Sequence, residues 1–272
     1  MKLALATTLV TLSALAVPVA PAAAVPPKGA RVVATAADAQ PAPAWVEADY
    51  LEVPSEGRPA RLALRVSMSP KGAIRQDIQD LGPRASLSTQ IWAPIGAAPA
   101  GAAALDEAPG WLQVLSGRPL AAVLRAKDVD ADKTSFAHDG PTILWVLGAG
   151  PHDSEAAQIR VERATGRLRR FTEIVLGPAA TDGGPPVRQV VTVRLAGAAA
   201  KEGAEAAWPA RIEVESAGRT VAFALRELTI GQPLDPDRFR AELPEEPAPP
   251  APPEQPATPA PGPDPGGPGA TL

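Results

Sequence analysis

The sequence predicts a mainly β fold in which many short strands form an antiparallel sheet. Apolar and polar residues alternate along most of the chain, which is the period of strands with one buried face and one wet face. Turn-forming residues separate these stretches at short intervals, as in antiparallel sheets and barrels rather than in doubly wound parallel sheets. Apolar residues recur at helical spacing near the middle of the chain, which predicts short helices packed on the sheet.

The first half of the domain is expected to hold four strands. They are predicted at residues 46–50, 62–68, 74–79 and 87–92. Pro70, Lys71 and Gly72 supply turn chemistry, so residues 62–79 are expected to form a hairpin. The preceding segment, residues 25–43, is rich in Ala and Pro without a sustained period, and it is interpreted as a flexible leader without a helix.

Two short helices are predicted in the middle of the chain. Their apolar residues are spaced three and four apart, as a helix requires: Trp111, Leu112, Val114, Leu115, Leu120, Val123 and Leu124. Gly117 and Pro119 must separate the two helices, because Pro lacks a backbone donor and clashes with the preceding turn. The apolar faces of these helices need a sheet to cover.

Strand patterns resume in the second half of the chain. They are predicted at residues 134–138, 142–147, 158–163, 168–176, 187–195, 210–215 and 220–228. Residues 142–147 are continuously apolar, which is typical of a strand covered on both faces. Ser216, Ala217, Gly218 and Arg219 are expected to join the last two strands by a tight turn.

Both ends of the chain are predicted to lie outside the domain. Residues 1–24 have Lys2, an apolar stretch and a run of small residues ending at Ala24, which predicts a cleaved signal peptide and a periplasmic protein. An uncleaved anchor is the alternative, but Pro18 and Pro21 break the apolar stretch, so no transmembrane segment is expected in the mature chain. Residues 245–272 are Pro-rich and predict a disordered tail, which serves as a spacer or as a peptide ligand for an envelope partner.

Charge and residue chemistry exclude several function classes. Acidic and basic residues nearly balance in the body of the chain, so no nucleic-acid partner is expected. The chain has no Cys and two His, which gives no metal-ligand spacing and no cofactor motif. His152, Asp153 and Ser154 are consecutive and cannot form a catalytic relay, so with His138 they are interpreted as turn residues and no catalytic residue is assigned.

Three stretches in the second half resemble the LolA-like family of outer-membrane lipoprotein carriers. They are residues 158–170, with a turn at Ala164-Thr165-Gly166; Trp208-Pro209 and the strand that follows; and Ile230 to Leu234 with Phe239 and Leu243-Pro244. The resemblance spans roughly residues 44–244. It implies a strongly curved antiparallel sheet, an incomplete barrel, with short helices as a lid, and a carrier or sensor rather than an enzyme. The absence of an opening amphipathic helix in residues 25–43 departs from the family pattern.

The expected function is to bind a lipid or the acyl chain of a lipoprotein in an apolar concavity, in lipoprotein or lipid trafficking. The predicted ligand-binding residues are the aliphatic and aromatic positions of the hairpin and the first central helix: Leu62, Leu64, Val66, Met68, Ile74, Ile78, Trp111, Leu112 and Leu115. These positions equally suit a packed core, and the alternative is an envelope interaction protein with a filled core and a spacer tail. Arg167, Arg169 and Arg170 either contact an anionic headgroup or partner or protect a strand edge.

Overall fold

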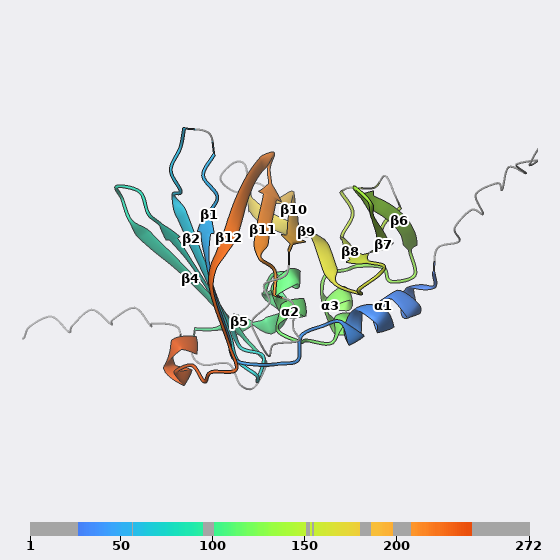
Figure 1. Cartoon of the computed structure of the whole chain (residues 1–272), viewed down its shortest axis with the longest axis horizontal. Helices are drawn as coiled ribbons and strands as arrows, with labels where there is room; N and C mark the ends of the chain where they lie inside the picture. Colours follow the sequence, from blue (N-terminus) through green and yellow to red (C-terminus); the bar gives the residue numbers. More distant parts are fainter. Residues whose placement is uncertain are drawn as a thin grey trace, which may run out of the picture.

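The computed structural model shows one sheet with short helices on one of its faces (Figure 1). It describes residues 27–55, 57–94, 101–150, 153, 155–179, 186–197 and 208–240. The predicted signal peptide, residues 1–24, and the predicted tail, residues 245–272, lie outside the described residues. All of the described strands fall within the predicted domain, residues 44–244.

Twelve strands form the sheet, in the order β5-β4-β3-β2-β1-β12-β11-β10-β9-β8-β7-β6. The strands are β1 (Val46–Glu52), β2 (Leu62–Met68), β3 (Ile74–Asp80), β4 (Ser86–Ala93), β5 (Ala103–Ala104), β6 (Thr134–Asp139), β7 (Thr142–Leu147), β8 (Gln158–Glu162), β9 (Leu168–Ala179), β10 (Pro186–Ala196), β11 (Arg211–Ser216) and β12 (Arg219–Ile230). Neighbours pair antiparallel except β4 and β5, which pair parallel. The pairing of β1 with β12 joins the first and last strands in the middle of the sheet.

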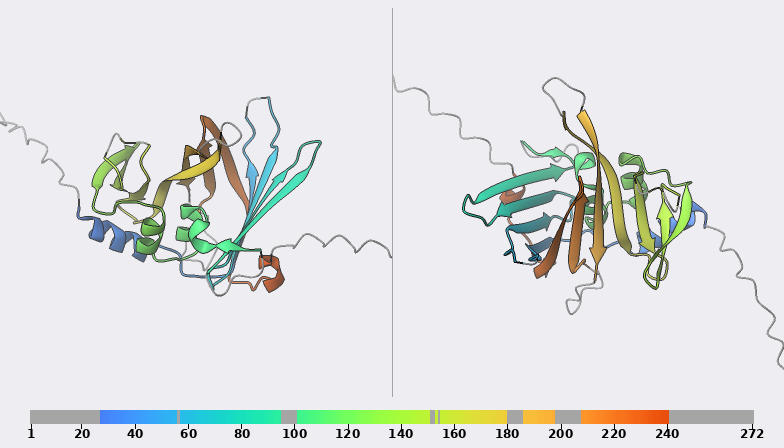
Figure 2. Two further views of the ribbon diagram at one scale, coloured as in Figure 1. Left: turned by 180° about the vertical axis from the view of Figure 1, so that it is seen from behind. Right: turned by 90° about the horizontal axis from the view of Figure 1, so that it is seen from above.

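The prediction of a mainly β, antiparallel architecture with short helices is confirmed. Each predicted strand is present, and the two predicted central helices are α2 (Gly110–Leu115) and α3 (Leu120–Ala126). The sheet is less strongly curved than the expected incomplete barrel. It is open, with β5 and β6 at opposite ends of the strand order, and seen from above its strands fan out side by side (Figure 2).

The interpretation of residues 25–43 as a leader without a helix is wrong. Helix α1 spans Gly29–Asp38 and buries Gly29, Val32 and Ala36 along one side. These residues are three and four positions apart, so they share one face of the helix. Two further single-turn helices, η1 (Leu105–Glu107) and η2 (Pro236–Phe239), flank the sheet.

Local sequence explains the turn between the two central helices and the turn of the last hairpin. Gly117 has a φ of 80°, a left-handed conformation that suits Gly, and it ends the segment of α2. Pro119 then stands at the N-cap of α3, where its missing N–H costs nothing. In the turn between β11 and β12, Ala217 and Gly218 both have positive φ, which matches the twist of a two-residue hairpin.

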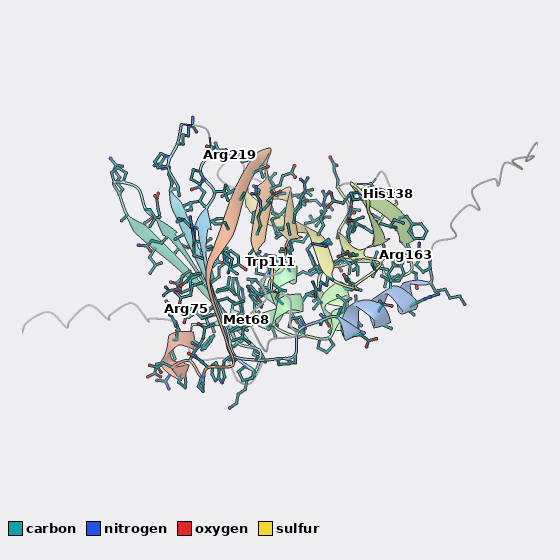
Figure 3. The ribbon with its side chains drawn as sticks, in the orientation of Figure 1. Met68, Arg75, Trp111, His138, Arg163 and Arg219 are labelled. Atoms are coloured by element: carbon teal, nitrogen blue, oxygen red, sulfur yellow. The ribbon has the colours of Figure 1, made fainter. Side chains whose placement is uncertain are left out.

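Helices α2 and α3 pack directly on the sheet and complete its core. The contact between α2 and β9 is so close that a Cβ on Gly110 would lie 2.2 Å from Cζ of Phe171. Trp111 and Met68 lie where the helices meet the sheet (Figure 3). We call the helix-covered side of the sheet the inner face and the other side the outer face. Strand alternation assigns Ile159, Phe171 and Val193 to the inner face, since all three belong to the buried core.

The closing segment of the domain packs beside the base of the sheet. Phe239 in η2 is buried, and its ring centroid lies 6.1 Å from that of Trp45. Arg238 forms an ion pair with Glu47 of β1 at 2.7 Å, and its carbonyl oxygen accepts a hydrogen bond from Arg75 of β3. Phe239 therefore anchors the end of the domain against β1 and β3.

Candidate functional site

A small hollow lies where α1, the α2–α3 pair and the strands β8 to β10 meet. Its volume is about 50 Å³. Most of its lining is aliphatic, contributed by Ala36, Ala39, Val114, Leu115, Leu120, Ile159, Val161, Leu168 and Leu195, with Pro41 and Pro209. A space of this size holds little more than a pair of methyl groups, so the hollow is a gap in the packing between helices and sheet.

Helix α1 forms one wall of this hollow, and side-chain hydrogen bonds join it to the domain near its two ends. At its start, the hydroxyl of Thr134 donates to the carbonyl oxygen of Pro27 at 2.8 Å. Beyond its end, Nε2 of Gln40 donates to the carbonyl oxygen of Arg118 at 3.2 Å. The middle of α1 rests on the turn between β8 and β9, where a Cβ on Gly166 would come within 2.5 Å of the carbonyl oxygen of Thr35.

Polar groups gather at the side of the hollow that faces the β8–β9 turn. Arg167 and Arg169 both line it, with Gln40 opposite. Arg169 is paired with Glu162, whose Oε2 lies 2.7 Å from Nη2 of the arginine. Arg167 is exposed and makes no ion pair with a described residue. The hollow thus joins an apolar interior to a cationic rim.

The structure places the predicted ligand-binding residues on the inner face but mostly away from this hollow. Seven of them are buried members of the core: Leu64, Val66, Met68, Ile74, Trp111, Leu112 and Leu115. Leu62 is half-buried against the core, and Ile78 is 37% exposed near the far end of the hairpin. Of the nine predicted residues, Leu115 alone lines the hollow. A role of these nine residues in ligand binding stays a prediction.

Half-buried apolar residues extend the inner face beyond the helices. They are Leu62, Val191, Val214, Val221 and Leu225, which pack on the edge of the core. Their strands run past the helices toward the hairpin tips (Figure 1). Arg219 marks one of these tips, at the β11–β12 turn (Figure 3). Part of the sheet is therefore apolar without being fully covered.

A buried ion pair ties both central helices to β9. Lys127, just after α3, has its Nζ 3.3 Å from Oε2 of Glu173, and both side chains are almost fully buried. The same carboxylate accepts a hydrogen bond from the backbone N–H of Gly110 at 3.2 Å. Because a buried charge needs a partner and hydrogen bonds, this group fixes the helices on the sheet.

The single tyrosine of the chain has a structural role. The Tyr50 hydroxyl donates to the carbonyl oxygen of Pro209 at 2.9 Å, which joins β1 to the segment before β11. Burial raises the pKa of Tyr50 well above its usual range, so this hydroxyl stays protonated. A proton held this firmly does not suit a catalytic acid or base.

The described residues hold no group of three or more His, Asp or Glu placed to bind a metal ion. His138 lies in strand β6 and not in a turn as expected, at the far end of the strand order from the predicted hairpin (Figure 3). His152 and Ser154 lie outside the described residues, so their interpretation as turn residues stays a prediction. Within the described part of the chain, every helix is too short or too polar to cross a membrane.

The walls contributed by α1 and by β8 to β10 are not among the predicted ligand-binding residues. Ala36 and Ala39 were assigned to a leader, because Ala carries little hydrophobic signal. The spacing of Gly29, Val32 and Ala36 is a signal that could have revealed the helix. Ile159 and Val161 were expected in a strand but not at a hollow, since periodicity gives the face of a residue and not the gaps beside it.

Some solved structures resemble this chain at low sequence identity. No family model matches the sequence, and no curated protein matches it. A LolA superfamily protein from Nitrosomonas europaea is similar in structure, with a TM-score of 0.37 and 12% identity over 79% of this chain and 98% of that one. An outer membrane lipoprotein-sorting protein domain from Vibrio parahaemolyticus gives a TM-score of 0.39 and 10% identity, over 76% of this chain and 94% of the domain.

Proposed function

We propose that this protein is a non-catalytic carrier or sensor that binds an acyl chain, or another lipophilic group, between helix α1 and the inner face of the sheet. The observation that carries the proposal is the aliphatic hollow under α1. It lies between elements from distant parts of the chain, and such junctions are the usual place of small-molecule sites.

Displacement of α1 would enlarge the hollow into a binding site. The helix buries only a narrow strip of residues, Gly29, Val32 and Ala36, and side-chain hydrogen bonds join it to the central part of the domain near its two ends. An acyl chain that replaces this strip gains about 0.8 kcal/mol for each CH₂ group removed from water. Several buried CH₂ groups therefore offset the exposure of Val32 and Ala36, which α1 now buries.

The cationic rim would orient an acidic ligand. A carboxylate or phosphate at the end of an acyl chain in the hollow would lie beside Arg167, which is exposed and free of ion pairs with described residues. Arginine suits this role because its guanidinium group donates in a planar fork to such oxygens. The neighbouring pair of Arg169 with Glu162 would stay intact.

The cellular setting belongs to the same proposal. A cleaved signal peptide would deliver the chain to the periplasm, where acylated lipoproteins and lipids are the available cargo. The Pro-rich tail would act as a spacer or as a ligand for an envelope protein partner. A binding protein of this kind needs no catalytic residue, metal or cofactor.

A fluorescent fatty-acid probe tests the proposal on the full mature chain after delipidation. Wild-type protein is expected to bind the probe with saturation. The variant Ala36→Leu fills the hollow, so it should bind the probe at least about tenfold more weakly while its melting temperature is unchanged or higher.

The matched control is Ala37→Leu, which adds the same side chain on the exposed side of the same helix. It should bind the probe like the wild type. Equal weakening by both variants, or no saturable binding by the wild type, contradicts a site under α1.

A second candidate is an interaction protein with a filled core. It is favoured by the burial of seven predicted ligand-binding residues inside the packed core. This alternative predicts that the protein purifies without lipid and that the probe does not bind. The same titration therefore separates the two functions.

A further inference from the structure

Three arginines lie side by side on the outer face of the sheet. The register pairs Arg160 of β8 with Arg170 of β9, and Arg170 with Arg194 of β10. Core residues flank Arg160 and Arg194 on both sides in their strands, and the core residue Phe171 follows Arg170, so alternation directs all three side chains to the outer face. Like charges directly opposite each other on neighbouring strands are destabilising. We call these residues the arginine row.

The arginine row does not protect a strand edge. Strands β8, β9 and β10 are interior in the strand order, with β7 and β11 on either side. Their backbone groups are paired within the sheet and need no defence against pairing with another chain. The interpretation of Arg170 as an edge charge is therefore wrong.

The charges in the row are unequally compensated. Arg194 has Glu215 at 3.3 Å and Glu213 at 4.0 Å. Arg160 and Arg170 form no ion pair with a described residue. Burial lowers the pKa of both arginines. The charge of Arg194 lowers the pKa of Arg160 further, and the charge of Arg160, with a smaller contribution from Arg194, lowers that of Arg170 further. Both guanidinium groups are thus held charged in surroundings that disfavour the charge.

Their hydrogen-bonding capacity is also largely unused. Nε of Arg170 is buried and has no partner among the described residues, and one terminal nitrogen makes a single long contact, 3.5 Å, to the Thr192 hydroxyl. Arg160 is oriented by Gln158, whose Oε1 accepts from its Nε at 3.1 Å. Gln158 is itself held by the carbonyl oxygen of Asp153 at 2.5 Å. The side chain of Arg160 is fixed, and its terminal nitrogens remain available.

The row borders a hollow on the outer face with a volume of about 370 Å³. Its charged and polar lining consists of Arg160, Arg169, Arg170 and Arg194 with His138 and Asp139 of β6 and Glu213 of β11. A matching row of charges exists on β1 to β3, but there Arg65 and Arg75 are paired with Asp49 and Asp77. Arg160 and Arg170 differ from that pattern, because neither forms an ion pair with a carboxylate of a described residue.

We propose that the arginine row is a binding site for a phosphate group, held on the outer face by Arg160 and Arg170 with Arg194 beside them. A phosphate offers several oxygens to the planar forks of two guanidinium groups and supplies the negative charge that the row lacks. The hollow has room for the group that carries the phosphate. Arg169 and Leu195 line both this hollow and the one under α1, but the phosphate proposal rests on the arginine row and not on the acyl-chain proposal.

Calorimetric titration with inorganic phosphate tests the site on the full mature chain. The wild type is expected to bind one phosphate. Arg160→Gln and Arg170→Gln should each weaken binding at least about tenfold, because each removes one charge-assisted donor group. Arg125→Gln removes an exposed arginine from α3 and should leave binding unchanged.

Two further readouts separate a binding site from a structural role. Without phosphate, Arg160→Gln should melt no lower than the wild type, because it relieves repulsion in the row. With phosphate, the wild type should gain melting temperature and the variant should gain less. Glu213→Gln should bind phosphate more tightly, since it removes a competing carboxylate from the margin of the hollow.

The source of the phosphate is distinguished by comparing glycerol phosphate with a short-chain phosphatidic acid below its micelle concentration. Equal binding assigns a free phosphate group, and tighter binding of the lipid assigns a headgroup. Either result requires that the Arg160→Gln/Arg170→Gln double variant lose the binding. The proposal is overturned if wild type and double variant respond alike to all three compounds, or if Arg125→Gln loses as much binding as the row variants.

Discussion

At the scale of single residues, the polar groups buried between helices and sheet decide how firmly the two layers are joined. Glu173 is the main example, because one carboxylate accepts from the start of α2 and pairs with Lys127 after α3. This group stabilises the domain because each of its buried charges has a partner. Its loss exposes a buried charge without a partner, which is more costly than the pair is stabilising.

Glu173→Gln is expected to destabilise the domain by about 3 kcal/mol, since Lys127 would keep its charge without a counter-ion. Urea denaturation measures the loss. The control is Asp130→Asn, which breaks the exposed pair with Lys133 and should change stability by less than about 0.5 kcal/mol. Similar effects of the two changes would contradict the anchoring role of Glu173.

The buried Tyr50 predicts a loss of stability at alkaline pH. Its pKa is raised in the folded state, so between the unfolded value of about 10 and the higher folded value the folded protein retains a proton that the unfolded chain has lost. The free energy of unfolding should therefore be unaffected below pH ~10 and fall above it by up to about 1.4 kcal/mol per pH unit.

Tyr50→Phe should remove this dependence and cost about 1 kcal/mol at neutral pH through the lost hydrogen bond to Pro209. Because Tyr50 is the one tyrosine of the chain, ultraviolet difference absorbance follows its ionisation alone. Ionisation near pH ~10 in the folded protein would show that the hydroxyl is not buried.

At the scale of elements, helix α1 is the part of the fold that the proposed function moves. Its end near the hollow is held by Gln40, and its other end by Thr134. Gln40→Ala should release the end at the hollow, so uptake of a fluorescent fatty acid should become faster while the melting temperature changes little. Stopped-flow mixing measures the rate.

The matched control for the release of α1 is Thr134→Val, which removes the hydrogen bond at the end away from the hollow. It should leave the uptake rate closer to that of the wild type. Faster uptake in the control than in Gln40→Ala would place the moving end of α1 at its N-terminus.

Elements differ in how far the sequence predicts them. The strands could be predicted because alternation follows directly from one buried and one exposed face, as in residues 62–68. Helix α1 could not be predicted as easily, since Val32 is the one large residue in its buried strip and small residues give a weak pattern. β5 has two residues, Ala103 and Ala104, too few for any period.

At the scale of the whole molecule, the sequence predicts which faces are apolar but not how well they are filled. Leu64 and Val66 face inward as expected, yet they belong to a packed core, and the hollow lies at the other side of the helices. Packing gaps depend on how elements from distant positions meet, and no local pattern records this. For the same reason the arginine row emerges only from the register of β8, β9 and β10.

The two proposed binding sites therefore lie on different faces of the sheet. We propose that the inner face, with α1 as a movable wall, binds an acyl chain, and that the arginine row binds a phosphate group. Ala36→Leu should affect the first activity alone, and Arg170→Gln the second alone. Loss of both activities in either variant would indicate general unfolding, which far-ultraviolet circular dichroism would reveal.

The central claim is that an acyl chain binds under α1, and photo-crosslinking tests it most directly. A fatty acid with a diazirine near its chain end is bound to the full mature protein, irradiated, and located by mass spectrometry of peptides. The account predicts labels near Ala36 and Ala39 of the α1 segment and near Ile159 and Val161 of β8, all competed by unlabelled fatty acid. Labels confined to other surfaces, or labelling that unlabelled fatty acid does not compete, would contradict it.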